Sequence, residues 1–378
     1  MAQNLFHLIK VNARITPLMS RKILKISGLV CLFGFAFVGL FLTAGFFAVK
    51  FHLTDASGRI DLNDRYFAQS ASAIRSVGQT SVNPSLLATN LCRAQALRKI
   101  FPENGSKILA TYELTRSDVV LAKMLASAEL YAGANSNYQT ERKKCDDENS
   151  ASSVLSNSQT DANLYGWIST PEWQTMKAAL SKDIDVINQV SAQIGVPARL
   201  IVAQIVGEQL RLFHDNREVF KQFFQPLKIL GNEVQFSLGV AGIKEETAKQ
   251  IERNLTDKSS AYYLGPDYEK MLAFKTADPN QERFARLTDE HDRTYSYLYT
   301  ALFLKQVETQ WQKAGFDISD RPEILATIFN VGFIKSVPKA DPQVGGSDIT
   351  INGRVYTFGS LAYEFYYSGE MGDEFPVK

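Results

Sequence analysis

Cysteine and histidine are scarce in this chain of 378 residues, which has three cysteines and four histidines. The histidines are scattered, and the sequence contains neither an HExxH nor a CxxC motif. Zinc and related metal sites need such side chains at short, regular spacings. The sequence therefore argues against a metal site, and we expect neither a metal ion nor a cofactor.

An excess of charge of one sign is also lacking, since 41 lysines and arginines stand against 40 aspartates and glutamates. Residues 1–25 hold five basic groups and no acid, which leaves 36 bases and 40 acids in residues 26–378. Nucleic-acid binding needs a concentrated basic face, so we expect no nucleic-acid partner. With 45% hydrophobic and 21% charged residues the chain can bury a core, which excludes wholesale disorder.

Residues 26–49 form an uncharged, apolar run of 24 residues, closed by Lys50. As a helix this run is ~36 Å long, enough to cross a hydrocarbon core of ~30 Å. A cleaved signal peptide, with an apolar region of about 7–15 residues, and a buried soluble helix are the alternatives. We predict a single transmembrane helix, with residues 1–25 as a basic cytoplasmic tail and residues 51–378 outside the cytoplasm.

Two cysteines, Cys92 and Cys145, lie beyond the predicted span, whereas Cys31 lies within it. An oxidising compartment permits a disulfide between Cys92 and Cys145. The bond also requires Cα atoms within about 6 Å of each other. The sequence does not show that approach, so paired and free thiols both stay open.

The chain beyond the predicted span divides into three segments. Residues 51–131 predict a helical membrane-proximal region, a stalk or packing module, with apolar residues at helical intervals along 84–100 and 117–131. Residues 132–163 are rich in serine, asparagine, glutamine and charge, and predict a polar linker or loop. Residues 164–378 predict a domain of the mainly α class.

Helix signals recur through this last segment. A hydroxyl cap at Thr170, followed by proline and an acid, is typical of a helix start. We place helices at 171–195, 198–213, 244–254, 294–314 and 321–329. Asp320 and Glu323 predict an acidic capping box for the last helix. Alternating residues on both sides of Asn352-Gly353 predict one small C-terminal β-hairpin.

Glu208 is the residue that most resembles a catalytic group. It follows a strongly apolar stretch whose only polar members are Arg199 and Gln204. Burial disfavours the ionised form of a carboxyl group, as a general acid working near neutral pH requires. The alternative is a structural glutamate paired with Arg211 or Lys228 at the end of the helix.

Two later segments accompany Glu208. They are Gly239-Val-Ala-Gly-Ile-Lys-Glu-Glu-Thr-Ala248 and Ala326-Thr-Ile-Phe-Asn-Val-Gly332. Together and in this order, the three pieces, over roughly 165–340, resemble the lysozyme-like lytic transglycosylases of bacterial cell walls, in the soluble-lytic-transglycosylase and goose-type lysozyme superfamily. In that family an acid ends a buried helix, a G-L-M-Q-x-x-P-x-T-A turn enters a helix, and an A-x-Y-N-x-G helix follows.

The resemblance implies a lysozyme-like helical catalytic domain and a role for each matching residue. Glu208 takes the place of the catalytic acid. The implied substrate-binding residues are Gly239, Val240, Ala241, Gly242, Ile243, Phe329 and Asn330. Important positions depart from the family pattern, because Gly242 stands for a glutamine, Glu245 for a proline and Phe329 for a tyrosine. The lost amide and phenol make a catalytically impaired domain, which binds glycan or scaffolds an envelope complex, the alternative.

The implied reaction cleaves the bond between N-acetylmuramic acid and N-acetylglucosamine. Glu208 protonates the glycosidic oxygen, and its carboxylate then takes the proton of the sugar's own 6-hydroxyl as that oxygen attacks C1. This leaves a 1,6-anhydro product and needs no second carboxylate. A muramidase that uses water would need one, and Glu218, Glu233 and Glu246 are the candidates.

The resemblance and the predicted span together imply a location and a set of partners. We expect a single-pass protein of the bacterial inner membrane whose bulk lies in the periplasm. Its implied partners are peptidoglycan glycan strands, the inner-membrane lipid bilayer and proteins of an envelope complex.

Overall fold

The computed structural model describes residues 84–146, 163–214, 237–289 and 291–377, together with residues 29, 32–41, 43, 44 and 47. Residues 1–55 and 224–234 group as one unit, and the remaining residues form the other, to which every element below belongs. In the first unit, residues 32–41 are helical and exposed. No helix within the described residues is both long and apolar enough to span a bilayer.

Several sequence predictions concern other parts of the chain. The basic tail 1–25, the rest of the predicted span 26–49, and the candidate acids Glu218 and Glu233 lie outside the described residues. Residues 57–83, which belong to the predicted membrane-proximal region, also lie outside them.

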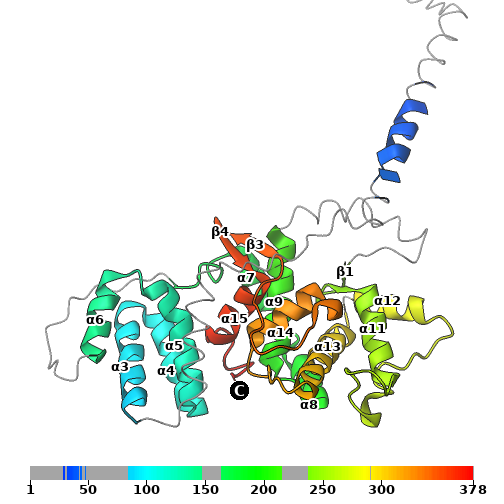
Figure 1. Cartoon of the computed structure of the whole chain (residues 1–378). Coiled ribbons are helices and arrows are strands. Elements are labelled where there is room, and N and C mark those ends of the chain that lie inside the picture. The colour runs from blue at the N-terminus through cyan, green and yellow to red at the C-terminus, as the bar shows by residue number, and fades with distance from the viewer. Residues whose placement is uncertain are drawn as a thin grey trace, which may run out of the picture. The chain divides into compact units, whose positions relative to one another are not determined.

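The described part of the second unit is mainly helical, which confirms the predicted class (Figure 1). Its helices are α3 (Pro84–Ile100), α4 (Pro102–Thr115), α5 (Asp118–Ala132), α6 (Ser136–Asp146), α7 (Pro171–Leu180), α8 (Ile184–Ile194), α9 (Ala198–His214), α11 (Glu245–Thr256), α12 (Pro279–Thr288), α13 (Thr294–Lys313), α14 (Pro322–Val331) and α15 (Phe358–Tyr367). Its strands are β1 (Ser237–Leu238), β2 (Ile243–Lys244), β3 (Asp348–Ile351) and β4 (Arg354–Thr357). Strand β1 pairs with β2 and β3 pairs with β4, and each pair is an antiparallel hairpin.

Helices α3 to α6 pack together and are joined by a disulfide between Cys92 on α3 and Cys145 on α6 (Figure 1). The Cα atoms of the two cysteines are 5.7 Å apart. The pairing that the sequence left open is therefore present. Helix α5 begins after Ser117, whose side chain accepts a hydrogen bond from the backbone N–H of Val120. The helices predicted along 84–100 and 117–131 are both confirmed.

The prediction of a linker across 132–163 is wrong for its first part, because residues 136–146 form α6. The composition of α6 is polar, and ion pairs of Arg93 with Asp146 and of Lys99 with Glu141 join it to α3. Two further anchors hold it in place. One anchor is the disulfide, and the other is Tyr138, which is fully buried and donates a 2.6 Å hydrogen bond to Glu129. Residues 147–162 lie outside the described residues.

Helix α5 connects this four-helix module to the rest of the unit. The hydroxyl of Tyr131 donates to Glu364 on α15, and Lys123 binds the carboxylate of Asp320 at 2.8 Å. This contact explains why the predicted capping box at Asp320 is wrong. The Asp320 side chain pairs with α5, and α14 starts after Arg321 without a side-chain cap. The module packs into the following domain.

The predicted helix 171–195 is interrupted and forms α7 and α8, with a turn at residues 181–183. Its start is as predicted, since Thr170 caps α7 by accepting from the backbone N–H of Trp173 at 3.2 Å. The hairpin at Asn352-Gly353 is confirmed as β3–β4, with both turn residues at positive φ. Helices α12 and α15 and the hairpin β1–β2 were not predicted from the sequence.

Helix α9 is fixed in the core by a single buried cation. The guanidinium of Arg199 donates hydrogen bonds of 2.7 to 2.8 Å to the backbone carbonyls of Phe365, Tyr366, Glu370 and Phe375. Burial lowers the pKa of Arg199 to about 10, so the group stays charged at neutral pH. The four carbonyl dipoles stabilise that charge and hold the end of α15 and the segment after it against α9.

Candidate active site

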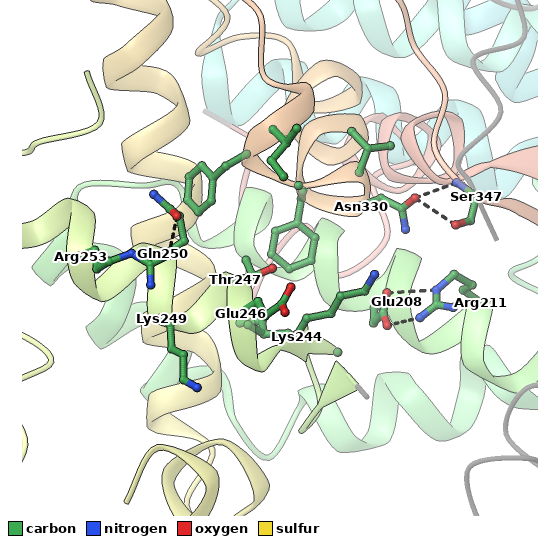
Figure 2. A pocket seen from close by; sticks show the side chains of 17 residues that line it. Glu208, Arg211, Lys244, Glu246, Thr247, Lys249, Gln250, Arg253, Asn330 and Ser347 are labelled. Carbon is green, nitrogen blue, oxygen red and sulfur yellow. Dashed lines mark hydrogen bonds and ion pairs between the residues drawn. The ribbon is translucent and has the colours of Figure 1, made fainter. Parts of the chain in front are cut away.

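A cavity of about 560 Å³ opens beside α9, α11 and α14 (Figure 2). Its lining residues are Glu208, Arg211, Gly242, Ile243, Lys244, Glu246, Thr247, Lys249, Gln250, Arg253, Phe329, Asn330, Val331, Gly332, Phe333, Ile334 and Ser347. The cavity thus collects residues from all three segments that carry the sequence resemblance. Its size is in the range of small-molecule sites.

Glu208 lies near the C-terminal end of α9 and is 4% exposed, so its predicted burial is confirmed. Arg211, one helical turn later, donates through Nε to Oε2 at 3.2 Å and through Nη2 to Oε1. This two-pronged pair balances a charge that would otherwise be buried alone. The structural partner that the sequence left open is therefore present. Donation of a proton by Glu208 requires Arg211 to leave at least one carboxylate oxygen.

The turn between β1 and β2 is built against the Glu208 carboxylate. Gly242 has a left-handed backbone with φ of +58°, and a Cβ placed on it would overlap Oε1 of Glu208. The next residue of α9, Gln209, donates from Nε2 to the carbonyl oxygen of Val240 at 2.5 Å and ties the turn to the helix. Where the family pattern has glutamine, this chain has room only for glycine.

The predicted substrate-binding residues divide into two groups. Gly242, Ile243, Phe329 and Asn330 line the cavity together with Glu208, whereas Gly239, Val240 and Ala241 do not. Ala241 is fully buried. Gly239 has φ of +67°, and a Cβ on it would overlap the carbonyl oxygen of Leu287, so this glycine allows α12 to approach.

Glu245, which replaces the proline of the family pattern, is the first residue of α11. The first turn of a helix favours both proline and acidic side chains. The departure at this position therefore preserves the start of the helix. Glu246, one of the candidate second acids, is the next residue and lines the cavity.

Helix α14 contributes Asn330 and Phe329. Asn330 accepts from Ser347 through Oδ1, at 2.8 Å from its N–H and 3.0 Å from its hydroxyl. With the oxygen so engaged, the amide NH₂ is the group that Asn330 offers to the cavity (Figure 2). The ring of Phe329 packs edge-on against Phe303, with centroids 5.2 Å apart. Phenylalanine supplies here an apolar wall in place of a phenol.

Sequence reasoning missed the remaining two walls. One is the polar face of α11, where Lys249, Gln250 and Arg253 lie beside the candidate acid Glu246; their spacing of three and four residues was the available signal. The other is apolar and includes Ile334 in the short helix η3 (Phe333–Lys335). The side chain of Ile334 is 93% exposed.

No protein-family model matches this chain, and neither a curated protein nor a solved structure matches it. Among the described residues, no group of three or more histidine, cysteine, aspartate or glutamate side chains is placed to hold a metal ion. The groups that the cavity presents are one buried carboxyl, its arginine partner, an oriented amide and the polar face of α11.

Proposed function

We propose that this chain is a peptidoglycan lytic transglycosylase with a lysozyme-like domain, in which Glu208 is the single catalytic acid and base. The observation that carries the proposal is the convergence of Glu208, Gly242 and Asn330 on one cavity. These residues come from three distant segments, and the sequence resemblance orders them in the same way. Pattern matches that arose by chance would have no reason to meet.

The proposed reaction uses the observed contacts in a defined order. As a glycan strand enters, Arg211 leaves one carboxylate oxygen and Glu208 takes up a proton. Glu208 gives that proton to the glycosidic oxygen as the bond from this oxygen to C1 breaks. The 6-hydroxyl oxygen of the same sugar then bonds to C1, and its proton returns to Glu208. Asn330 donates from its amide to the sugar and orients it, so the attack is intramolecular.

The proposed location follows from residues 26–49, which we infer to be a single membrane anchor with residues 51–378 on the periplasmic side of the bacterial inner membrane. The disulfide between Cys92 and Cys145 supports this placement, because such bonds persist in oxidising compartments outside the cytoplasm. The proposed partners are peptidoglycan strands, the lipid bilayer and proteins of an envelope complex.

The test is the substitution Glu208→Gln, with Glu246→Gln as the matched control from the same cavity. Glutamine keeps the size and polarity of Glu208 but has no transferable proton. We expect Glu208→Gln to reduce release of muropeptides from isolated sacculi by about 10²–10⁴-fold, with the fold retained. Glu246→Gln should remain active, and the products should carry 1,6-anhydro ends by mass spectrometry. Full activity of a folded Glu208→Gln protein would exclude Glu208 as the catalyst.

A second function is favoured by the pairing of Glu208 with Arg211 and by the missing phenol at Phe329. In this alternative the domain binds glycan, or scaffolds an envelope complex, without cleaving it. Wild-type protein would then sediment with sacculi and release no muropeptides. In this case the Arg211→Gln variant would release no muropeptides either. If Arg211 only holds the carboxylate of Glu208 between turnovers, the Arg211→Gln variant should still cleave glycan for one or more turnovers.

A further inference from the structure

Helix α11 gives one end of the cavity a basic character. Arg253 and Gln250 lie at the end opposite to Glu208 and Arg211 (Figure 2). Lys249, on the same face, is paired with Glu245 at 2.8 Å. Arg253 differs from it, because within the described part of the chain its side chain forms no ion pair.

A series of buried amides holds Arg253 in place. Gln306 on α13 donates from Nε2 to the carbonyl oxygen of Ile251 at 3.0 Å and accepts from Nδ2 of Asn254 at 3.2 Å. Asn254 accepts from Nε2 of Gln250 at 3.1 Å. Gln250 therefore turns its oxygen outward, and Nη2 of Arg253 donates to it at 2.6 Å. Each bond fixes the orientation of the next amide.

The amide series gives Arg253 more support than an exposed arginine at the end of a helix needs. Burying the amides of Gln306 and Asn254 is unfavourable unless their donors and acceptors are satisfied. Nε2 of Gln250 and the hydroxyl of Ser260 both donate to Oδ1 of Asn254 at 3.1 Å, and the first of these bonds orients the oxygen of Gln250 toward Arg253. The guanidinium has five N–H donors, and Gln250 is the one side-chain acceptor it has among the described residues. The other donors remain for a ligand at the cavity wall.

We propose that Arg253 binds a carboxylate of the peptide side chain carried by the glycan strand. This inference rests on the proposed function and names the second part of the substrate that the same cavity receives. The sugars of the strand offer hydroxyl and acetamido groups, whereas its peptides carry carboxylates. A planar guanidinium held by one edge matches a carboxylate with two parallel hydrogen bonds.

The geometry separates the two recognition events. From Glu245, its first residue, to Arg253, α11 advances about 12 Å at ~1.5 Å per residue, and Arg253 lies at the end of the cavity opposite to Glu208 (Figure 2). The peptide site thus lies well away from the bond that Glu208 would break. Arg253 acts on binding and register of the strand and takes no part in proton transfer.

The experiment compares full-length wild-type protein with Arg253→Gln and with the control Lys258→Gln. Lys258 lies two residues beyond α11, its side chain is 75% exposed, and it is absent from the cavity lining, so its loss changes the net charge equally. The substrates are insoluble peptidoglycan with its peptides and the same material after an amidase has removed them. Cleavage and co-sedimentation are measured for each protein at low and high salt.

We expect Arg253→Gln to lower kcat/KM on the peptide-bearing substrate roughly fivefold at low salt, the magnitude of an exposed ion pair, mainly through KM. The loss should shrink at high salt. It should be absent on the substrate without peptides and in Lys258→Gln. Equal activity of Arg253→Gln and wild type on both substrates, or an equal loss on both, would overturn the inference.

Failure of the proposed function gives a different result. If wild-type protein cleaves neither substrate, co-sedimentation alone decides about Arg253. Binding that depends on the peptides and is weakened by Arg253→Gln would uphold the peptide site on a non-cleaving domain. Equal binding to both substrates would reject the peptide site. A lower melting temperature of Arg253→Gln, with losses on both substrates, would assign the amide series a structural role only.

Discussion

Replacing Gly242 by alanine tests how closely the β1–β2 turn is built against the candidate acid. Two separate penalties arise from this one methyl group. The first is backbone strain, because φ of +58° costs a residue with a Cβ about 1–2 kcal/mol. The second is overlap, because the new Cβ would approach Oε1 of Glu208 to well under 3.0 Å. Glu208 would have to retreat by more than about 1 Å to restore normal contact at ~3.5 Å.

The overlap has a free-energy cost of its own, separate from the backbone strain. Forcing a methyl group into a packed site costs about 1–3 kcal/mol, so the free energy of unfolding should fall by about 2–5 kcal/mol in total. A displacement of about 1 Å at a reacting group can reduce the rate ~10²-fold. We expect a loss of that order in glycan cleavage by Gly242→Ala, if the proposed activity is correct.

Gly195→Ala is the matched control. Gly195 has φ of +74°, and a Cβ on it would meet nothing within 4 Å, so this variant suffers the backbone strain alone. Urea denaturation of both variants should differ by the 1–3 kcal/mol of overlap. In a Glu208→Ala background that difference should vanish, because the carboxylate is gone. Equal destabilisation by the two alanines in the wild-type background would refute the close contact between turn and acid.

Two further predictions concern stability. Burial raises the pKa of Glu308 on α13 to about 7, from the 4.5 of a free side chain, so the folded protein holds an extra proton between these values. Stability should therefore fall from pH 4.5 to 7 by up to about 1.4 kcal/mol per pH unit, and urea denaturation of Glu308→Gln should show a flatter dependence; an unchanged slope would contradict this. Replacing Cys92 and Cys145 together by serine should lower the free energy of unfolding by about 2–4 kcal/mol. Alkylation of both thiols in unreduced, folded wild-type protein would show that they are not paired.

The helices that the sequence predicted well are those whose signals are local. Residues 84–100 and 198–213 carry apolar side chains at helical intervals, and α3 and α9 follow them closely. Elsewhere, a residue distant in the sequence determines whether a helix forms or how it is capped. The side chain of Asp320 has the right position to cap α14 but binds Lys123 instead. Helix α6 has no apolar stripe at all and depends on residues far from it in the sequence.

The candidate site shows the same limit. Glu208 was identified because a buried polar residue in an apolar helix stands out in a sequence, whereas Asn330 was identified only through the resemblance of its segment to a family motif. The pairing of Glu208 with Arg211 was one of two options that the sequence left open. The amide series behind Arg253 joins α11 to α13 through Asn254 and Gln306, which are 52 residues apart, and its members on α11 look like ordinary surface residues when that helix is considered alone. The need for glycine at position 242 likewise could not be predicted from the sequence, because it depends on where the Glu208 carboxylate lies in the fold.

The four hydrogen bonds of Arg199 have a consequence for the order in which the protein is made. Phe375, whose carbonyl accepts one of them, is synthesised 176 residues after Arg199. Until that segment has emerged, α9 carries a cation with no native partner, and burying it is strongly unfavourable. Glu208 is on the same helix, so we expect its cavity to be completed only after the residues up to Phe375 have been synthesised. Any activity of this cavity therefore begins only once the chain through Phe375 is available to fold.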